Sequence, residues 1–477
     1  MSYLYVVVLA IIVTALLAVA VYRSFMVKSK ADYLVAGRSL PAFVLVLTLL
    51  TSWIGAGSLF AGAESAYRNG VAALWIAAGG WVGLLLIYFV APRARRFAQF
   101  TLPDLLEIRY NQTARILGAI AILFAYTAIT SYQFRGGGDV LHLIFPDTIT
   151  HEQGTWIIAA FVILTTALAG MSSVAYMDVA IGSLVTIILL IAAPMLYIKA
   201  GGLTGLHAVL PETHFHLLGT INFAQAMEFF IPTLFLLLGN QVMYQKFFSA
   251  KTERDARISV VGWFLGTILL ESLIVAIAIC GSALYATGEV AAHPREIIPY
   301  TARHGLPALM GAIFLGAIFA KVISTASNYL FSSSTNLVND LFARYIWPNA
   351  SNKRVLITSR IIVVFVGCWA LYQALYAESI LAKMLYAYTI YSAALTPVVL
   401  AAFFSKRVTA WGAVAAIATG TVVTLVWDIQ SVRTFFPPIL AQRDAIFPAL
   451  FAAVAAMVLV SFVTPAPTPE QLAQFAD

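Results

Sequence analysis

The chain has 477 residues, of which 61% are apolar and 10% are charged, and its formal net charge is +7. Soluble domains carry about 25% charged residues, so this composition excludes a soluble, disordered or disulfide-rich protein. Apolar stretches recur along the chain and the positive residues gather between them, so the net charge does not indicate nucleic-acid binding. The sequence predicts an all-α polytopic membrane protein.

Thirteen stretches have about the 20 apolar residues that a membrane-spanning helix needs. In chain order, the predicted spans are residues 3–22, 42–67, 71–91, 114–134, 154–172, 176–198, 222–243, 258–284, 307–340, 356–376, 379–404, 408–428 and 445–463. The first stretch has no basic region before it and no small-residue cleavage site after it. We therefore interpret it as a span and not as a signal peptide.

The positions of lysine and arginine predict the orientation. With the N-terminus outside, the cytoplasmic connections, Lys246 included, hold 18 of the 28 basic residues, and the outer connections hold seven. This bias satisfies the positive-inside rule. The sequence thus predicts a protein of the plasma membrane or a bacterial inner membrane, with the N-terminus outside and the C-terminus in the cytoplasm.

Two predicted spans contain residues that interrupt helices. The second span has two glycines between hydroxyl residues in Thr51–Ser58, and the seventh has Pro232 and Gly239 around an apolar stretch. They are five spans apart and therefore run in opposite directions, which is the pattern of transporters that bind solute and ions at broken helices of an inverted repeat. The alternative is that these glycines only ease helix packing.

The pattern predicts five segments. They are an N-terminal extra span with the first cytoplasmic loop (1–41), a first five-helix repeat (42–198), a second five-helix repeat (199–404), two C-terminal spans (405–463) and a disordered cytoplasmic tail (464–477).

Five motifs occur in a fixed order over about residues 1–430. They are DYLVAGRSL (32–40), TLPDLLEIRY (101–110), GMSSVAYMD (170–178), NQVMYQKFFSAK (240–251) and STAS…SSS…ND (324–340). Together they resemble the sodium:solute symporter family, which includes sodium–glucose, sodium–proline and high-affinity choline transporters.

The resemblance implies alternating access about a site near mid-membrane. Sodium takes oxygen ligands, and the positions that match the family's are the carbonyls of Thr51 and Ile54 and the hydroxyls of Ser324 and Thr325. The fifth ligand would be the carbonyl of the residue three before this Ser-Thr pair. Relatives usually have a small residue there, whereas this chain has Lys321.

Lys321 lies too deep in its span for its side chain to reach either membrane surface, and a charge at that depth is a functional candidate. Three interpretations remain open. In the first, which we favour, Lys321 exchanges a proton and couples transport to H⁺. In the second, Lys321 is a fixed charge tethered to Asp178 and transport is uncoupled, and in the third its side chain points away from the site and sodium still binds. Asp178 itself is expected at the cytoplasmic end of its span, where a helix N-terminus also favours an acid.

The candidate solute site contains aromatic and polar side chains. Trp53 lies in the broken span and attracts organic cations, and Ala63–Tyr67 resembles a choline-transporter pattern, whereas Asn240 and Gln241 resemble a polar pair of sugar-transporting relatives. Further candidates are Ser58, Tyr132, Tyr244, Tyr386, Tyr388 and Tyr391. The solute therefore stays open among a sugar, an amino acid and an organic cation.

Two more acids lie within spans, Glu228 and Glu271. We expect structural roles for both, in pairs with Lys383 or Arg360 or with water.

The sequence does not favour an enzyme. The histidines lie in or beside outer connections, and there is no phosphate-binding loop of the Gly-x4-Gly-Lys-Ser/Thr type. We predict a symporter that imports a small polar solute, without a cofactor, and whose partners are the solute, a coupling cation and the bilayer. H⁺ is favoured over Na⁺; the alternatives are a sodium-coupled symporter, an uncoupled facilitator and a transporter-like sensor.

Overall fold

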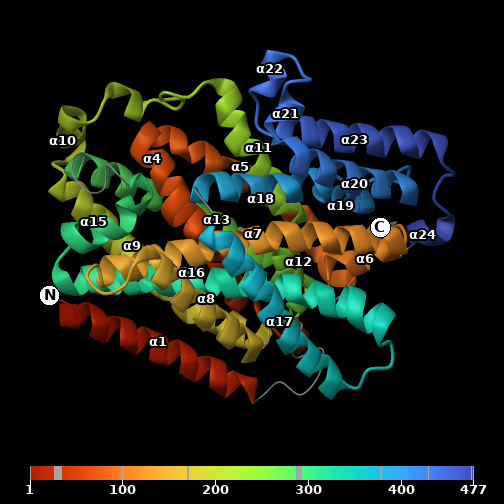
Figure 1. Cartoon of the computed structure of the whole chain (residues 1–477), viewed down its shortest axis with the longest axis horizontal. Helices are drawn as coiled ribbons and strands as arrows, with labels where there is room; N and C mark the ends of the chain where they lie inside the picture. The colour runs from red at the N-terminus through yellow and green to blue at the C-terminus, as the bar shows by residue number, and fades with distance from the viewer. Residues whose placement is uncertain are drawn as a thin grey trace.

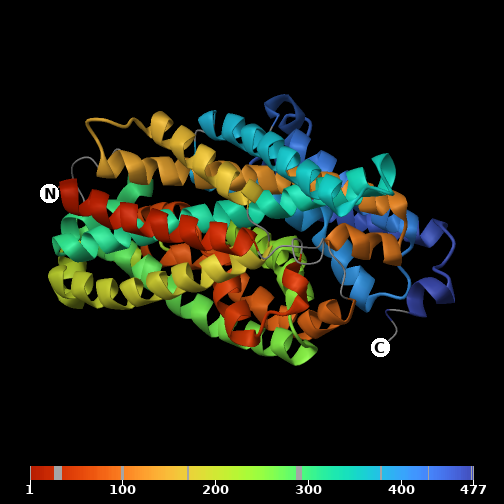
Figure 2. The ribbon, with the colours of Figure 1, turned by 90° about the horizontal axis from the view of Figure 1, so that it is seen from below.

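The structure is a computed structural model that describes residues 2–25, 35–97, 101–168, 171–285, 293–376, 379–427, 429–473 and 475. Within these residues the chain is a bundle of helices, most of which lie along the longest axis of the molecule (Figure 1). Helices α1 (Ser2–Ser24) and α24 (Pro469–Ala473) begin and end the described chain, and Figures 1 and 2 show the two termini at opposite ends of the bundle.

The first half of the chain contains η1 (Ala36–Arg38), α3 (Ala42–Trp53), η2 (Gly57–Gly62), α4 (Ala63–Asn69), η3 (Gly70–Ala73), α5 (Leu74–Phe97), α6 (Leu102–Arg109), α7 (Gln112–Ile144), α8 (His151–Leu168), α9 (Met171–Lys199), α10 (Gly202–Val209) and η4 (Glu212–Phe215). The second half contains α11 (Phe223–Gly239), α12 (Gln241–Ser249), α13 (Glu253–Leu284), η5 (Pro294–Glu296), α15 (Ile297–Gly305), α16 (Ala308–Asn336), η6 (Leu337–Ile346), α17 (Asn352–Leu375), α18 (Ile380–Ala394), α19 (Thr396–Phe404), α20 (Ala410–Trp427), α21 (Gln430–Arg433), α22 (Pro438–Ala441) and α23 (Ile446–Val463).

Ten helical stretches of the described residues are long and apolar enough to cross a membrane. Two shorter apolar helices, Tyr3–Val19 and Ala42–Trp53, lie in predicted spans. The multi-pass membrane class is confirmed, whereas the number of thirteen spans stays a prediction.

The second predicted span is broken where its sequence indicates. Helix α3 ends at Trp53, Ile54 is extended with φ −76° and ψ 119°, and the chain resumes in η2. The amide of Ala56, freed by this break, donates a hydrogen bond to Gln133 Oε1 at 2.8 Å. A Cβ atom at Gly55 would lie 2.7 Å from Gln133 Nε2 and 2.8 Å from Thr325, so only glycine lets the three segments approach.

The seventh span is also broken, one residue after Gly239. Asn240 separates α11 from α12, and its side chain accepts a hydrogen bond from the amide of Val242 at 3.0 Å, which caps α12. Pro232 lies within α11 without ending it, and its carbonyl accepts a hydrogen bond from Ser392 Oγ at 2.7 Å. Two breaks are present, while the five-plus-five repeat and the segment boundaries stay predictions.

Helix α16 positions the site because it is buried from Phe314 to Asn336 without interruption. It packs against α7, α9 and α1, and its hydroxyl and amide side chains therefore face neighbouring helices and not lipid. Buried polar groups need partners, so this helix organises the polar contacts described next.

The C-terminal tail differs from the predicted disorder. The described part contains α24, and the ring of Phe475 stacks on Phe97 with centroids 4.4 Å apart. An apolar side chain in the tail thus packs on the bundle, which the tail's proline-rich polar composition does not indicate.

Candidate ion and solute site

Asp178 is the centre of a buried polar cluster. It is fully buried in α9, and its carboxylate accepts hydrogen bonds from the hydroxyls of Thr48 and Ser324 and from Asn328 Nδ2 at 3.3 Å. Asp178 lies past the first turn of α9, so it does not cap the helix N-terminus, and it joins that helix to α3 and α16. Its position at the cytoplasmic end of the span stays a prediction.

Lys246 pairs with Asp178, which sequence reasoning missed. Its Nζ lies 3.2 Å from Asp178 Oδ2, donates to the carbonyl of Thr48 at 2.9 Å, and also contacts the Ser52 hydroxyl. Lys246 was assigned to a cytoplasmic connection, yet it is fully buried in α12. The only signal was its place six residues after the break at Asn240.

Lys321 points into the protein. Its side chain is 1% exposed, and Nζ donates a hydrogen bond to the carbonyl of Leu50 at 3.2 Å, just before the break in α3. Among the described residues it makes no ion pair with a carboxylate. The predicted tether to Asp178 is therefore wrong, because Lys246 is the partner of that carboxylate.

Four of the five oxygens that the family resemblance assigns to sodium come together. Thr325 Oγ1 lies 3.1 Å from the carbonyl oxygen of Thr51, 3.2 Å from that of Ile54 and 3.0 Å from that of Lys321. The hydroxyl of the fifth, Ser324, donates to Asp178 instead. The amine of Lys321 donates to Leu50, next to Thr51, so it lies on the same segment of α3 as this oxygen cluster.

A small cavity adjoins Asp178. Its volume is about 10 Å³, enough for about one water molecule. The lining includes Asp178 and Ser324, together with Ser327 and Thr166, whose hydroxyl oxygens have no hydrogen-bond partner among the described residues. The cavity therefore offers polar contacts next to the carboxylate.

A second cluster surrounds Glu271 of α13. Its two oxygens accept hydrogen bonds from Trp53 Nε1 at 3.0 Å and Trp81 Nε1 at 2.9 Å, and Ser58 lies nearby. The expected pairing of Glu271 with Lys383 or Arg360 is therefore wrong. The two donors that hold this carboxylate are neutral indoles, so neither balances its negative charge.

Two of the candidate tyrosines lie at the same place. The hydroxyls of Tyr132 and Tyr388 both lie beside Gly57, where a Cβ atom would be 3.2 Å from the Tyr388 hydroxyl and 3.6 Å from that of Tyr132. Since Gly57 and Ser58 are adjacent, the structure brings four predicted solute-site residues together: Trp53, Ser58, Tyr132 and Tyr388.

Asn240 and Gln241 belong to a different network. Asn240 accepts from the Tyr126 hydroxyl at 2.8 Å and donates to that of Tyr329 at 3.1 Å, whereas Gln241 bonds to Ser332 at 2.9 Å. Tyr391 accepts a hydrogen bond from the Gln241 amide at 2.9 Å. These groups satisfy one another at the second break and do not contact the Glu271 cluster.

The remaining candidates also lie elsewhere. The Tyr244 hydroxyl donates to the carbonyl of Leu238 at 2.9 Å, and Lys383 Nζ lies 5.3 Å from the ring centroid of Tyr386. Glu228 lies 3.7 Å from Arg443, so the expectation of a structural pair holds with a different partner.

Two broken helices with buried charges beside them are typical of a secondary membrane transporter. The sequence profile of the sodium:solute symporter family matches residues 33–420. The chain therefore belongs to the sodium:solute symporter family.

Similar proteins include two bacterial proline transporters. The chain is 26% identical over 470 residues to the high-affinity proline transporter PutP of Bacillus subtilis (strain 168), which covers 94% of this chain and 95% of that protein. It is 26% identical over 421 residues to the sodium/proline symporter of Escherichia coli (strain K12), with 84% and 83% covered.

Solved structures with a similar fold are also transporters. A substrate-bound, outward-open Na⁺-coupled sialic acid symporter has a TM-score of 0.81 at 18% identity, with 98% of this chain and 99% of that chain covered. The nucleobase-cation-symport-1 family transporter Mhp1 in a closed conformation has a TM-score of 0.60 at 13% identity, with 94% and 99% covered. At these identities the likeness shows the fold alone.

Proposed function

We propose that this protein imports a small amine-bearing solute by alternating access, in symport with H⁺ that exchanges at Lys321. The observation that carries the proposal is the charge count beside the break in α3. Two amines, those of Lys246 and Lys321, lie near a single carboxylate, Asp178, which pairs with Lys246, and all three side chains are buried. An uncompensated buried charge costs several kcal/mol, so release of a proton from Lys321 removes an unfavourable ammonium.

The contacts of Lys321 fit this exchange. Its Nζ bonds to a carbonyl and not to a carboxylate, so a neutral amine keeps a role there as a donor to Leu50. The cavity beside Asp178 lies close to the same cluster and provides room for a water molecule in proton transfer. The proton is then loaded when the site faces one side of the membrane and released when it faces the other.

For the solute we propose a small zwitterionic amino acid of the proline type. The support comes from the names of the relatives, which are proline transporters, and from Glu271. This carboxylate accepts a hydrogen bond from Trp53, lies near Tyr388 and is held by neutral donors, so it attracts a primary or secondary ammonium group. Asn240 and Gln241 form a closed network, which weighs against their use for a sugar.

Sodium is the second candidate coupling ion. Family membership favours it, and so do the three carbonyl oxygens that lie 3.0 to 3.2 Å from Thr325 Oγ1. A sodium ion at these oxygens requires Lys321 to be neutral or displaced, since two cations at this separation repel in a poorly screened interior.

We further propose the topology that the basic residues predict. The N-terminus lies outside and the C-terminus in the cytoplasm, with repeats over residues 42–198 and 199–404 and two more spans over 405–463.

Uptake of labelled proline into proteoliposomes tests the coupling. Inward H⁺ and Na⁺ gradients are imposed separately on the native protein, on Lys321→Ala and on Lys383→Ala, a matched control in α18. We expect about tenfold faster uptake with the H⁺ gradient, in the native protein and the control but not in Lys321→Ala. Uptake that follows sodium equally in all three proteins contradicts H⁺ coupling. Uptake of another amine in place of proline overturns only the solute assignment.

A further inference from the structure

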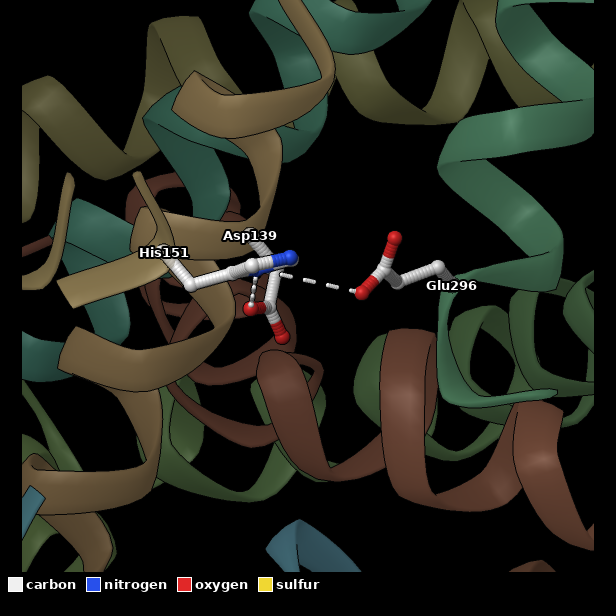
Figure 3. A group of neighbouring side chains, drawn as sticks. All are labelled: Asp139, His151 and Glu296. Atoms are coloured by element: carbon white, nitrogen blue, oxygen red, sulfur yellow. Dashed lines mark hydrogen bonds and ion pairs between the residues drawn. The ribbon is translucent and has the colours of Figure 1, made fainter. Parts of the chain in front are cut away.

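A group of metal-ligating side chains lies outside the ion and solute site, at the end of the bundle where α1 begins. Asp139 is near the end of α7, His151 is the first residue of α8 and Glu296 ends η5 (Figure 3). Figure 3 shows the Glu296 carboxylate directed across a gap towards the other two side chains. The three residues come from three separate segments.

The distances suit a tetrahedral metal ion. The three ligand atoms lie within 4.8 Å of one another, with His151 Nδ1 2.7 Å from Asp139 Oδ1 and 4.0 Å from Glu296 Oε1. Ligand atoms around tetrahedral zinc, at bond lengths of about 2.0 to 2.2 Å, lie about 3.3 to 3.6 Å apart. Shifts of under about 1 Å therefore convert the observed spacing into a coordination shell.

Glu296 has an unsatisfied oxygen aimed into the group. Its side chain is 8% exposed, and Oε1 has no hydrogen-bond partner among the described residues. Arg295 Nη2 is 3.6 Å from this oxygen, too far for a hydrogen bond.

Two arginines flank the three ligands. Arg295 Nε donates to Asp139 Oδ2 at 2.9 Å and its Nη2 donates to Asp139 Oδ1 at 3.4 Å, so the guanidinium orients the carboxylate, and a metal at Oδ1 replaces the longer of these two bonds. The positive charges of Arg295 and Arg135 offset part of the negative charge of the carboxylates. The rings of His142 and His293 have their centroids 4.0 and 6.0 Å from that of His151.

An open cavity gives access to the group. Its volume is about 400 Å³, and His151, Glu296, His142 and His293 are among its lining residues. An ion can therefore reach His151 and Glu296 through this cavity, and Asp139 lies directly behind His151.

We propose that Asp139, His151 and Glu296 bind a transition-metal dication of the zinc type. Imidazole together with carboxylate is a set that suits Zn²⁺, and the ion replaces the proton shared by His151 Nδ1 and Asp139 Oδ1. Bound metal joins α7, α8 and η5, which the contacts of His151 and Arg295 with Asp139 already bring together. The site is independent of the proposed transport function.

Zinc titration of the full-length protein in detergent micelles, against a chromophoric chelator, tests this proposal. We expect one zinc ion per chain with micromolar or tighter affinity, about tenfold weaker binding in Glu296→Gln and none in His151→Asn. His304→Ala is the matched control, because His304 lines the same cavity outside the three ligands, and its affinity should equal the native value.

A second measurement uses only the native chain, so a folding defect in the variants cannot affect it. The visible absorption of Co²⁺ bound to the native chain reports coordination by nitrogen and oxygen, and we expect this absorption to disappear when excess Zn²⁺ displaces the Co²⁺. No stoichiometric binding by the native chain overturns the proposal. Binding that survives both ligand variants but is lost in His304→Ala also overturns it.

Discussion

Two buried charge clusters in this molecule have opposite imbalances. Beside the break in α3, two amines face the single carboxylate of Asp178. Where α6 and α7 meet η6, the guanidinium of Arg115 contacts three carboxylates, with Asp104 at 2.6 Å and Asp340 at 2.7 Å, and with Glu107 closest.

The difference lies in access to water. Glu107 is 22% exposed and pairs with the half-exposed Arg344 at 3.1 Å, so solvent and a second cation balance the Arg115 cluster. The three charged side chains of the Asp178 cluster are all buried, and the small cavity beside Asp178 adjoins them. Among the described residues, neither solvent nor a second carboxylate balances their excess positive charge, so we place proton exchange there and assign a structural role to the Arg115 cluster.

Arg115→Met should have the largest effect on stability. It leaves three carboxylates facing one another with little compensation, and removal of one partner from a buried ion pair costs about 3 to 5 kcal/mol. Unfolding of the purified protein in detergent, followed by circular dichroism, measures the loss. Arg344→Met serves as a control and should cost far less, because that side chain is 55% exposed. Equal losses of unfolding free energy in the two variants would show that the buried Arg115 cluster contributes no more to stability than the exposed pair of Arg344.

Lys246→Met should cost less than Arg115→Met, about 1 to 3 kcal/mol. Asp178 keeps its bonds from Thr48 and Ser324, and the nearby amine of Lys321 takes over as its counter-charge. The double variant Lys246→Met/Lys321→Met should therefore lose more than the sum of the single variants. Strict additivity in the same unfolding assay would show that the two amines do not share Asp178.

Glu271→Gln should cost about 1 kcal/mol and weaken solute binding. The amide oxygen still accepts from one indole, but the amide nitrogen cannot accept from the other, and the negative charge is lost. Equilibrium binding of labelled solute to the purified protein measures the second effect. Glu228→Gln, a span acid paired with Arg443, should bind as the native protein does. Unchanged binding in Glu271→Gln would remove this carboxylate from the solute site.

Glu64→Ala should have the smallest effect, about 0.3 to 0.5 kcal/mol. It removes a pair with Arg68 one helical turn away at 3.1 Å, and Arg68 is 57% exposed. The same unfolding assay in high salt should erase this difference while it leaves that of Arg115→Met. A loss as large as that of Lys246→Met would mean that burial does not separate these pairs.

The sequence was sufficient for features that depend on local pattern. Glycines and hydroxyl residues predicted the break after Trp53, and the depth of Lys321 in an apolar stretch predicted that its amine stays inside the protein. Membership of the family followed from motifs in their order along the chain.

Contacts between side chains from distant parts of the chain were not predictable. Lys246 follows a mixed polar and apolar segment (240–245) and was counted in a cytoplasmic connection, because nothing local shows that α12 is buried after the break at Asn240. The indole bond from Trp53 to Glu271 joins residues 218 positions apart. Asn240 and Trp53 belong to different hydrogen-bond networks because of the way the helices pack together, and the order of residues along the chain does not show this packing.

Solute-driven proton movement tests the central claim most directly. A pH-sensitive dye is trapped in sodium-free proteoliposomes, and solute is added outside to the native protein and to Lys321→Met, with solute binding confirmed separately for both. The account predicts acidification of the interior with the native protein and none with Lys321→Met. Equal acidification with both proteins, or solute uptake by the native protein without any acidification, would contradict it.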